Sequence, residues 1–117
     1  MKQRILFADD EPISRKLISR FLRGEGYEVD EAEDGAEALG LLNTFQFDLV
    51  ISDIRMPRVD GIAVVTRLRS IYPETPFIVL TSYPNDARDL SKMPKSLVLG
   101  KPVLLDNLKS NIQRLLN

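Results

Sequence analysis

The stretch ISDIRMPRVDG, which runs from Ile51 to Gly61, carries an acid at the end of an apolar run. The preceding residues LVI (49–51) are strong strand formers, and the run ends at Asp53. A proline at position 57 and the glycine at 61 then indicate a turn. A single acid at the end of a strand can be a solvated residue or a turn former with no function. Whether Asp53 belongs to a functional site therefore depends on which other residues the fold places beside it.

Strand-length apolar runs alternate with helix-spaced apolar residues along the chain. The strand-like runs occupy 5–8, 27–32, 49–51, 77–80 and 97–99. Helical spacing occupies 12–24, 36–42, 62–72 and 105–116, and we expect a short fourth helix within 85–93 that Pro94 ends. In the first helix the repeat consists of Ile13, Leu17, Ile18, Phe21 and Leu22. This alternation predicts right-handed βαβ units and a parallel sheet.

The apolar content of the strands predicts their order in the sheet. The runs at 5–8, 49–51 and 77–80 are the most apolar, so we expect them at the centre, covered on both faces. The segment 27–32 carries several acids and suits an edge. We therefore predict one α/β domain over residues 1–117, a flavodoxin-like (βα)5 doubly wound parallel sheet with strand order 2-1-3-4-5.

Composition narrows the functional classes. A net charge of −1 means that the chain has no excess of basic residues, so we expect no nucleic-acid binding through this domain. The chain has no cysteine and no histidine, which excludes disulfides, thiolate or imidazole metal ligands and histidine general bases. No apolar run approaches about 18 residues and no signal-peptide pattern opens the chain, so we expect a soluble cytoplasmic protein that does not enter a membrane.

Polar side chains follow four of the five expected strands. They are Asp9 and Asp10 after the first, Asp53 after the third, Thr81 and Ser82 after the fourth, and Lys101 after the fifth. Each has an ordinary explanation alone, since an acid before a helix can cap it and a lysine is most often solvated. Together they predict a site, because the carboxyl ends of parallel strands meet at one edge of the sheet.

Three carboxylates in one place require a counter-charge. Two unit charges about 4 Å apart repel by about 4 kcal/mol at an effective dielectric near 20. Lys101 supplies only one positive charge, whereas Mg²⁺ favours carboxylate oxygens together with waters and a phosphate. A metal ion, a free carboxylate, a lysine and a hydroxyl are the parts that phosphoryl transfer to an aspartate needs.

The chain resembles the receiver domain of two-component response regulators over essentially its whole length. The resemblance rests, in chain order, on Asp9-Asp10, Asp53, Met56-Pro57, Asp60-Gly61, Thr81 and Lys101-Pro102. It implies that Asp53 is the phosphoacceptor. It also implies a Mg²⁺ site in which Asp10 binds the ion directly and Asp9 largely through water. Asp53 and the backbone carbonyl of Arg55 complete that implied site.

The resemblance implies roles for two further residues and for a partner. Thr81 would hydrogen-bond the phosphoryl group, Lys101 would pair with it, and the Lys101–Pro102 bond would be cis. A histidine kinase or histidine phosphotransfer protein would supply the phosphoryl group. The chain would then assist its own phosphorylation and dephosphorylation without being an enzyme, and would signal to a downstream protein or domain by conformational change.

Two features depart from the family pattern. Val98 stands where members usually carry an aromatic residue, three positions before the lysine, and the segment between Thr81 and Lys101 is about two residues short. We therefore expect the response to phosphate to involve ordering of the segment 85–93 rather than the swing of a ring. The alternative is an output through the first helix, whose expected exposed face carries Arg15, Lys16, Ser19, Arg20 and Arg23.

Two other functions remain open at this point. An aspartate-nucleophile phosphatase of similar fold needs a second acid two residues after the nucleophile, and Arg55 at that position argues against it. A protein-interaction module that keeps the fold but is not phosphorylated is the alternative. The complete set of acids argues against that reading, whereas Val98 keeps it open.

Overall fold

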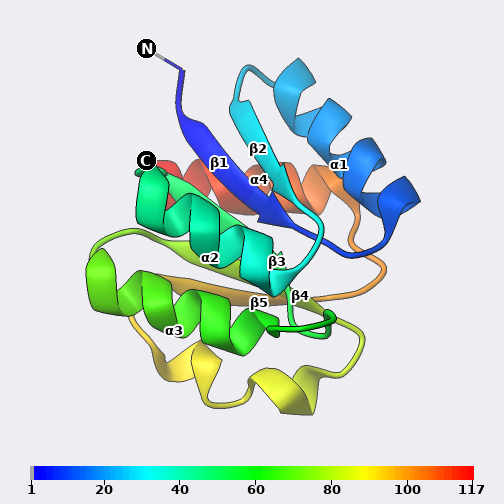
Figure 1. The fold of residues 1–117 in the computed structure, drawn as a ribbon. Coiled ribbons are helices and arrows are strands. Elements are labelled where there is room, and N and C mark those ends of the chain that lie inside the picture. Colours follow the sequence, from blue (N-terminus) through cyan, green and yellow to red (C-terminus); the bar gives the residue numbers. More distant parts are fainter. Residues whose placement is uncertain (1) are drawn as a thin grey trace.

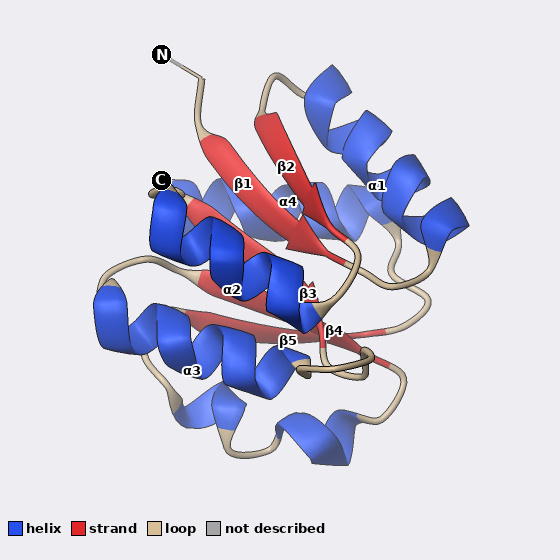
Figure 2. Cartoon of the chain, in the orientation of Figure 1, coloured by secondary structure: helices blue, strands red, loops and turns tan. Residues whose placement is uncertain are grey.

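The computed structural model describes residues 2–117, which form one five-stranded parallel sheet flanked by helices (Figures 1 and 2). The strands are β1 (Arg4–Ala8), β2 (Glu28–Ala32), β3 (Leu49–Asp53), β4 (Phe77–Thr81) and β5 (Ser96–Gly100). The α-helices are α1 (Pro12–Gly24), α2 (Gly35–Thr44), α3 (Gly61–Ile71) and α4 (Leu105–Leu116). No helix within residues 2–117 has the length and apolar character that crossing a membrane requires.

The strand order is β2-β1-β3-β4-β5, so the predicted flavodoxin-like arrangement is confirmed. β3 and β4 are buried along their whole length, and β1 is buried after its first residue. β2 and β5 form the two edges, and both are only partly buried. The apolar runs therefore occupy the centre because only there can both faces of a strand be covered.

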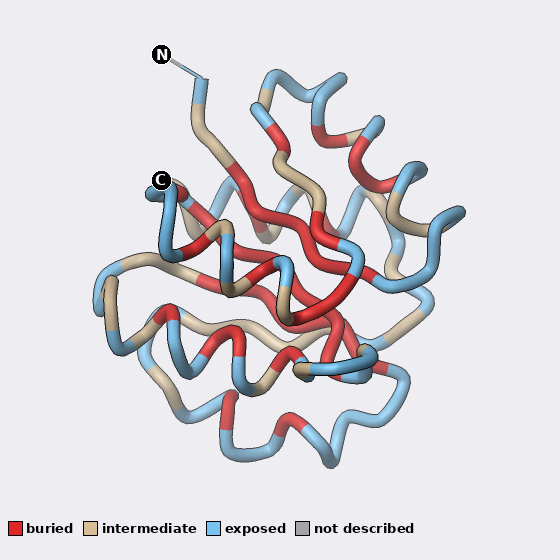
Figure 3. The backbone as a smooth tube through the Cα atoms, in the orientation of Figure 1, coloured by how far each residue is buried: buried red, intermediate tan, exposed pale blue. Residues whose placement is uncertain are grey.

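Two apolar layers cover the sheet, one on each face. α2 and α3 pack on one face around Leu6, Val50 and Val79. α1 and α4 pack on the other face, where Ile18 and Leu108 meet residues such as Ile51. Figure 3 shows the buried residues concentrated in the central strands and on the inner sides of the helices. This packing holds the carboxyl ends of β1, β3 and β4 in fixed positions.

The expected fourth helix is absent from the described residues, and this part of the (βα)5 prediction was wrong. Two 3-10 turns, Pro84–Ala87 and Leu90–Lys92, connect β4 to β5 instead. Only Ala87 and Leu90 of these turns are buried. With so little apolar surface and Pro94 directly after Met93, the segment cannot sustain a longer helix.

The arginine Arg69 on α3 fastens the far end of this connection. Its guanidinium donates to the carbonyl oxygens of Tyr72, Pro73 and Thr75 at 2.8–3.4 Å, and to Pro94 O at 2.8 Å. The same side chain therefore closes the end of α3 and holds the entry to β5. The first 3-10 turn lies at the opposite end of the connection, next to the end of β4.

Helix α1 uses only part of its apolar repeat in the core. Ile18 and Leu22 are buried, whereas Ile13 is 79% and Leu17 57% exposed. The polar Ser19, which the sequence places on the exposed face, is fully buried. Ile13 and Leu17 instead line a groove of about 610 Å³ that continues along Pro102, Val103 and Leu105.

Candidate phosphoacceptor site

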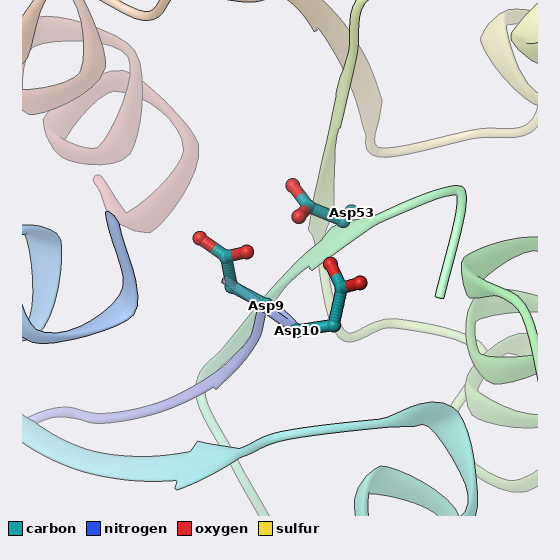
Figure 4. Close-up of side chains that lie close together, drawn as sticks. All are labelled: Asp9, Asp10 and Asp53. Atoms are coloured by element: carbon teal, nitrogen blue, oxygen red, sulfur yellow. The ribbon is translucent and has the colours of Figure 1, made fainter. Parts of the chain in front are cut away.

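Three carboxylates meet beyond the ends of β1 and β3, which are neighbours in the sheet. One oxygen from each of Asp9, Asp10 and Asp53 lies within 4.8 Å of the others, as the sequence predicts (Figure 4). Asp9 is fully buried and Asp53 is 2% exposed, whereas Asp10 faces solvent. The cluster therefore has two enclosed members and one accessible one.

The turn after β3 explains why Asp53 stands where it does. The Ser52 hydroxyl donates to the Asp53 carbonyl oxygen at 2.8 Å, and Gly61 N donates to Ile54 O at 2.7 Å. Asp60 caps α3 by accepting a hydrogen bond from the backbone N–H of Ala63. The start of α3 thus closes directly onto the end of β3, and the acid stands at the junction.

Gly61 is required for this junction because it leaves no room for a side chain. A Cβ built at this position would overlap the Asp53 carbonyl oxygen and lie 2.8 Å from the Asp53 carbonyl carbon. The glycine therefore allows the helix to approach the strand end closely. The turn residues of the stretch from Ile51 to Gly61 therefore fix the position of the Asp53 carboxylate.

Lys101 and Thr81 lie beside Asp53, as predicted. The Lys101 ammonium is 2.8 Å from Asp53 Oδ1. Lys101 N also donates to Thr81 O at 2.8 Å, which ties the ends of β4 and β5 together. The Lys101–Pro102 bond is cis. Thr81 is 3% exposed, and its hydroxyl oxygen accepts a hydrogen bond from Tyr83 N at 2.8 Å.

The two buried acids share a strongly unfavourable environment for charge. Burial, followed by the neighbouring Asp9, raises the pKa of Asp53 to about 7, although Lys101 opposes the shift. Burial also opposes ionisation of Asp9, yet the neighbouring Asp53 and a hydrogen bond from Glu11 N to Asp9 Oδ1 at 3.0 Å leave its pKa below the usual value. In the metal-free site ionisation is therefore disfavoured at Asp53 and favoured at Asp9.

The donor set fits a hard divalent cation. Oδ2 of Asp9 and Oδ2 of Asp53 are buried and have no hydrogen-bond donor within residues 2–117. Buried polar atoms are normally paired, so these two oxygens are suited to a cation rather than to the protein itself. Helix capping does not explain the pair Asp9-Asp10, because the N-cap residue of α1 is Glu11.

Sequence reasoning missed a group of residues around the mouth of the site. The Arg55 guanidinium lies 3.7 Å above the Tyr83 ring and its Nε is 3.0 Å from Asp86 Oδ2. The Arg55 side chain and Tyr83 line a cavity of about 70 Å³ that also contains Asp53 and Lys101. No spacing rule signals these contacts, since they join the loops after two different strands.

Comparison with known proteins identifies the family of the chain. Residues 5–113 match the family described as response regulator receiver domain. Sensor protein EvgS of Escherichia coli O157:H7 is 39% identical over 97% of this chain and 10% of its own length. Response regulator MprA of Mycobacterium sp. (strain KMS) is 36% identical over 99% of this chain and 51% of its own length. The chain thus spans about half or less of the length of these relatives.

Solved structures show the same fold. TrrA of Thermotoga maritima, a response regulator in complex with Mg²⁺-BeF, has 40% identity and a TM-score of 0.88, with 98% of this chain and 99% of that chain covered. The chemotaxis response regulator CheY4 of Vibrio cholerae has 33% identity, the same TM-score and the same coverage. Receiver domains of this kind are signalling modules of two-component systems, found in sensor kinases and response regulators alike. The chain belongs to the response regulator receiver domain family.

Proposed function

We propose that Asp53 accepts a phosphoryl group in a Mg²⁺-dependent reaction and that the chain signals through the resulting change in conformation. The observation that carries the proposal is the position of Asp53, which is buried beside two further acids and 2.8 Å from a lysine. The reaction makes the chain a phosphoacceptor that assists its own phosphorylation and dephosphorylation. A histidine kinase or histidine phosphotransfer protein is the proposed donor.

Asp10, Asp53 and the backbone carbonyl of Arg55 would hold the metal ion, with Asp9 acting largely through water. When bound, Mg²⁺ neutralises charge on the phosphoryl oxygens and on the acids. The orphaned oxygens of Asp9 and Asp53 support this assignment. So does the Mg²⁺-BeF complex of the related TrrA.

Three side chains of the site have different roles in phosphoryl transfer. A carboxylate oxygen of Asp53 forms a bond to phosphorus, while the bond from phosphorus to the donor imidazole nitrogen breaks and that nitrogen keeps the electron pair. Lys101, already beside Asp53, would pair with a phosphoryl oxygen as a mobile point charge. The Thr81 hydroxyl would donate to another phosphoryl oxygen, which it can do by rotation while it keeps its acceptor role toward Tyr83.

The donor protein would dock over the groove beside α1. The groove shares Leu80, Ser82 and Lys101 with the cavity that contains Asp53. Its exposed apolar residues Ile13 and Leu17 are unusual on the surface of a small protein and suit a protein partner. From a protein docked in this groove, a phosphohistidine would reach the Asp53 cavity by passing Leu80, Ser82 and Lys101.

The direct test uses acetyl phosphate with the intact protein. We expect the protein with Mg²⁺ to gain the mass of one phosphoryl group, and the gain to disappear with chelator or in Asp53→Asn. Asp89→Asn is a matched control, because its side chain is 97% exposed on the connection after β4. Undiminished labelling of Asp53→Asn would contradict the proposal.

Replacing Asp10 should separate metal binding from stability. We expect Asp10→Ala to lower Mg²⁺ affinity by at least about tenfold, because removing even an outer partner of a metal site costs about 10- to 100-fold. In chelator its free energy of unfolding should rise slightly, by less than about 1 kcal/mol, since Asp10 is exposed and does not cap α1.

Calorimetric titration and urea unfolding measure the two quantities. Glu33→Ala is the control, because Glu33 is an exposed acid after β2 and lies outside the cluster. Equal Mg²⁺ affinity in Asp10→Ala and the wild type would exclude Asp10 as a metal ligand.

A further inference from the structure

Three residues form a clasp over the mouth of the phosphoacceptor cavity, and we call them the Arg55 clasp. Arg55 lies on the loop after β3, and Tyr83 and Asp86 lie on the connection after β4. The guanidinium of Arg55 stacks on the Tyr83 ring at 3.7 Å, and its Nε is 3.0 Å from Asp86 Oδ2. The clasp links the loop that follows Asp53 to the first 3-10 turn.

The clasp is also joined to the expected phosphoryl ligands. Arg55 and Tyr83 line the same cavity as Asp53, Thr81 and Lys101. Tyr83 N donates to the Thr81 hydroxyl oxygen at 2.8 Å. A change at Asp53 therefore reaches the clasp by two routes, directly through the cavity and through Thr81.

We propose that Arg55 exchanges partners on phosphorylation, from Asp86 to the phosphoryl group on Asp53. This inference rests on the proposed function. The Arg55 side chain is 62% exposed, and an exposed ion pair with one carboxylate is weak. A phosphoryl group carries about −1.5 to −2 charges and offers three acceptor oxygens, to which the planar guanidinium can bind with two parallel hydrogen bonds. The new partner therefore outcompetes Asp86.

The exchange would loosen the connection after β4, which is the opposite of the ordering that the sequence predicts for this segment. Asp86 lies within the first 3-10 turn, and only Ala87 and Leu90 anchor the two turns in the core. Short 3-10 turns have poor hydrogen-bond geometry and little stability of their own. Once Arg55 leaves Asp86, the segment from Tyr83 to Met93 keeps its core contacts through Ala87, Leu90 and Met93 but loses its ion pair with the loop after β3. This segment then carries the signal, in place of the ring that Val98 cannot supply.

A double-mutant cycle with beryllofluoride and Mg²⁺ as the probe tests the exchange. Asp86→Asn removes the competitor, so we expect it to tighten beryllofluoride binding about threefold. Arg55→Ala should weaken binding about tenfold, and Arg55→Lys, which keeps the charge but loses the planar fork, should fall between. In the Arg55→Ala background Asp86→Asn should have no effect. Asp89→Asn, which removes a charge from the same segment outside the clasp, should match the wild type.

Hydrogen exchange of the segment from Tyr83 to Met93 provides the second readout. We expect faster exchange in wild type on adding beryllofluoride, and equally fast exchange in Asp86→Asn without it. Unchanged beryllofluoride affinity in Asp86→Asn, or the same gain in the Arg55→Ala background, would overturn the exchange. Failure of acetyl phosphate to label wild-type Asp53 would instead overturn the proposed function, so the two failures are distinguishable.

Discussion

Asp53→Asn is expected to make the metal-free protein more stable by about 2 to 3 kcal/mol near pH 8, and by almost nothing near pH 4. Asp53 has a pKa of about 7 in the folded protein, well above the ordinary value of 3.8. A raised pKa means that the folded state prefers the protonated acid. The stability this preference provides is complete below about pH 3.8 and is lost as the pH rises through 7.

An asparagine at position 53 avoids that loss because it carries no charge at any pH and keeps a donor toward Asp9. The attraction of Lys101 is already included in the pKa of Asp53, because Lys101 lowers that pKa. Relaxation of the buried site keeps the gain below what the full shift would give. Urea unfolding in chelator across this pH range measures the effect, with Asp89→Asn as the exposed control. A variant that is less stable than wild type near pH 8, or a gain that does not vary with pH, would contradict the assignment of buried charge to Asp53.

Gly61→Ala is expected to cost roughly 3 kcal/mol or more of folding stability. The added methyl group would overlap the Asp53 carbonyl oxygen and lie 3.0 Å from Ile54 Cα. Both obstacles are backbone atoms of the strand end, so α3 and β3 must separate. Since a displacement of about 1 Å at a reacting group can cost about 100-fold in rate, phosphorylation of Asp53 should slow by a similar factor.

Gly40→Ala is the matched control for this substitution. Gly40 lies within α2, and a Cβ there would meet nothing within 4 Å. The change should therefore stabilise the protein by about 0.5 to 1 kcal/mol through helix propensity. Chemical unfolding of both variants measures the change in stability, and acetyl phosphate labelling of each measures the change in phosphorylation rate. Wild-type stability in Gly61→Ala would show that the junction between β3 and α3 is not close-packed.

The sheet could be predicted because the apolar residues that form each central strand are contiguous in the sequence. The apolar runs that end at Ala8, Asp53 and Thr81 needed both faces covered, which placed β1, β3 and β4 at the centre. The acids of β2 placed it at an edge. The main site residues followed from the same reasoning, because strand order alone determines which strand ends meet.

Other features depend on side-chain geometry that no periodicity encodes. The residues Ile13 and Leu17 share the spacing of Ile18 and Leu22, yet they lie where no strand covers them. The contact of Arg55 with Asp86 joins two loops 31 residues apart and depends on the path of each loop. The connection after β4 could be predicted as short, but its 3-10 geometry depends on how few of its residues find a place in the core.

Peptide mapping of the phosphorylated protein tests the central claim most directly. After reaction with acetyl phosphate and Mg²⁺, borohydride reduces an acyl phosphate to an alcohol and so marks the modified carboxylate. We predict that Asp53 is the one residue marked, and that neither Asp9 nor Asp10 is. A mark on another acid, a stable phosphate on a hydroxyl residue, or no mark at all would contradict the account, and the last result would favour an interaction module of the same fold.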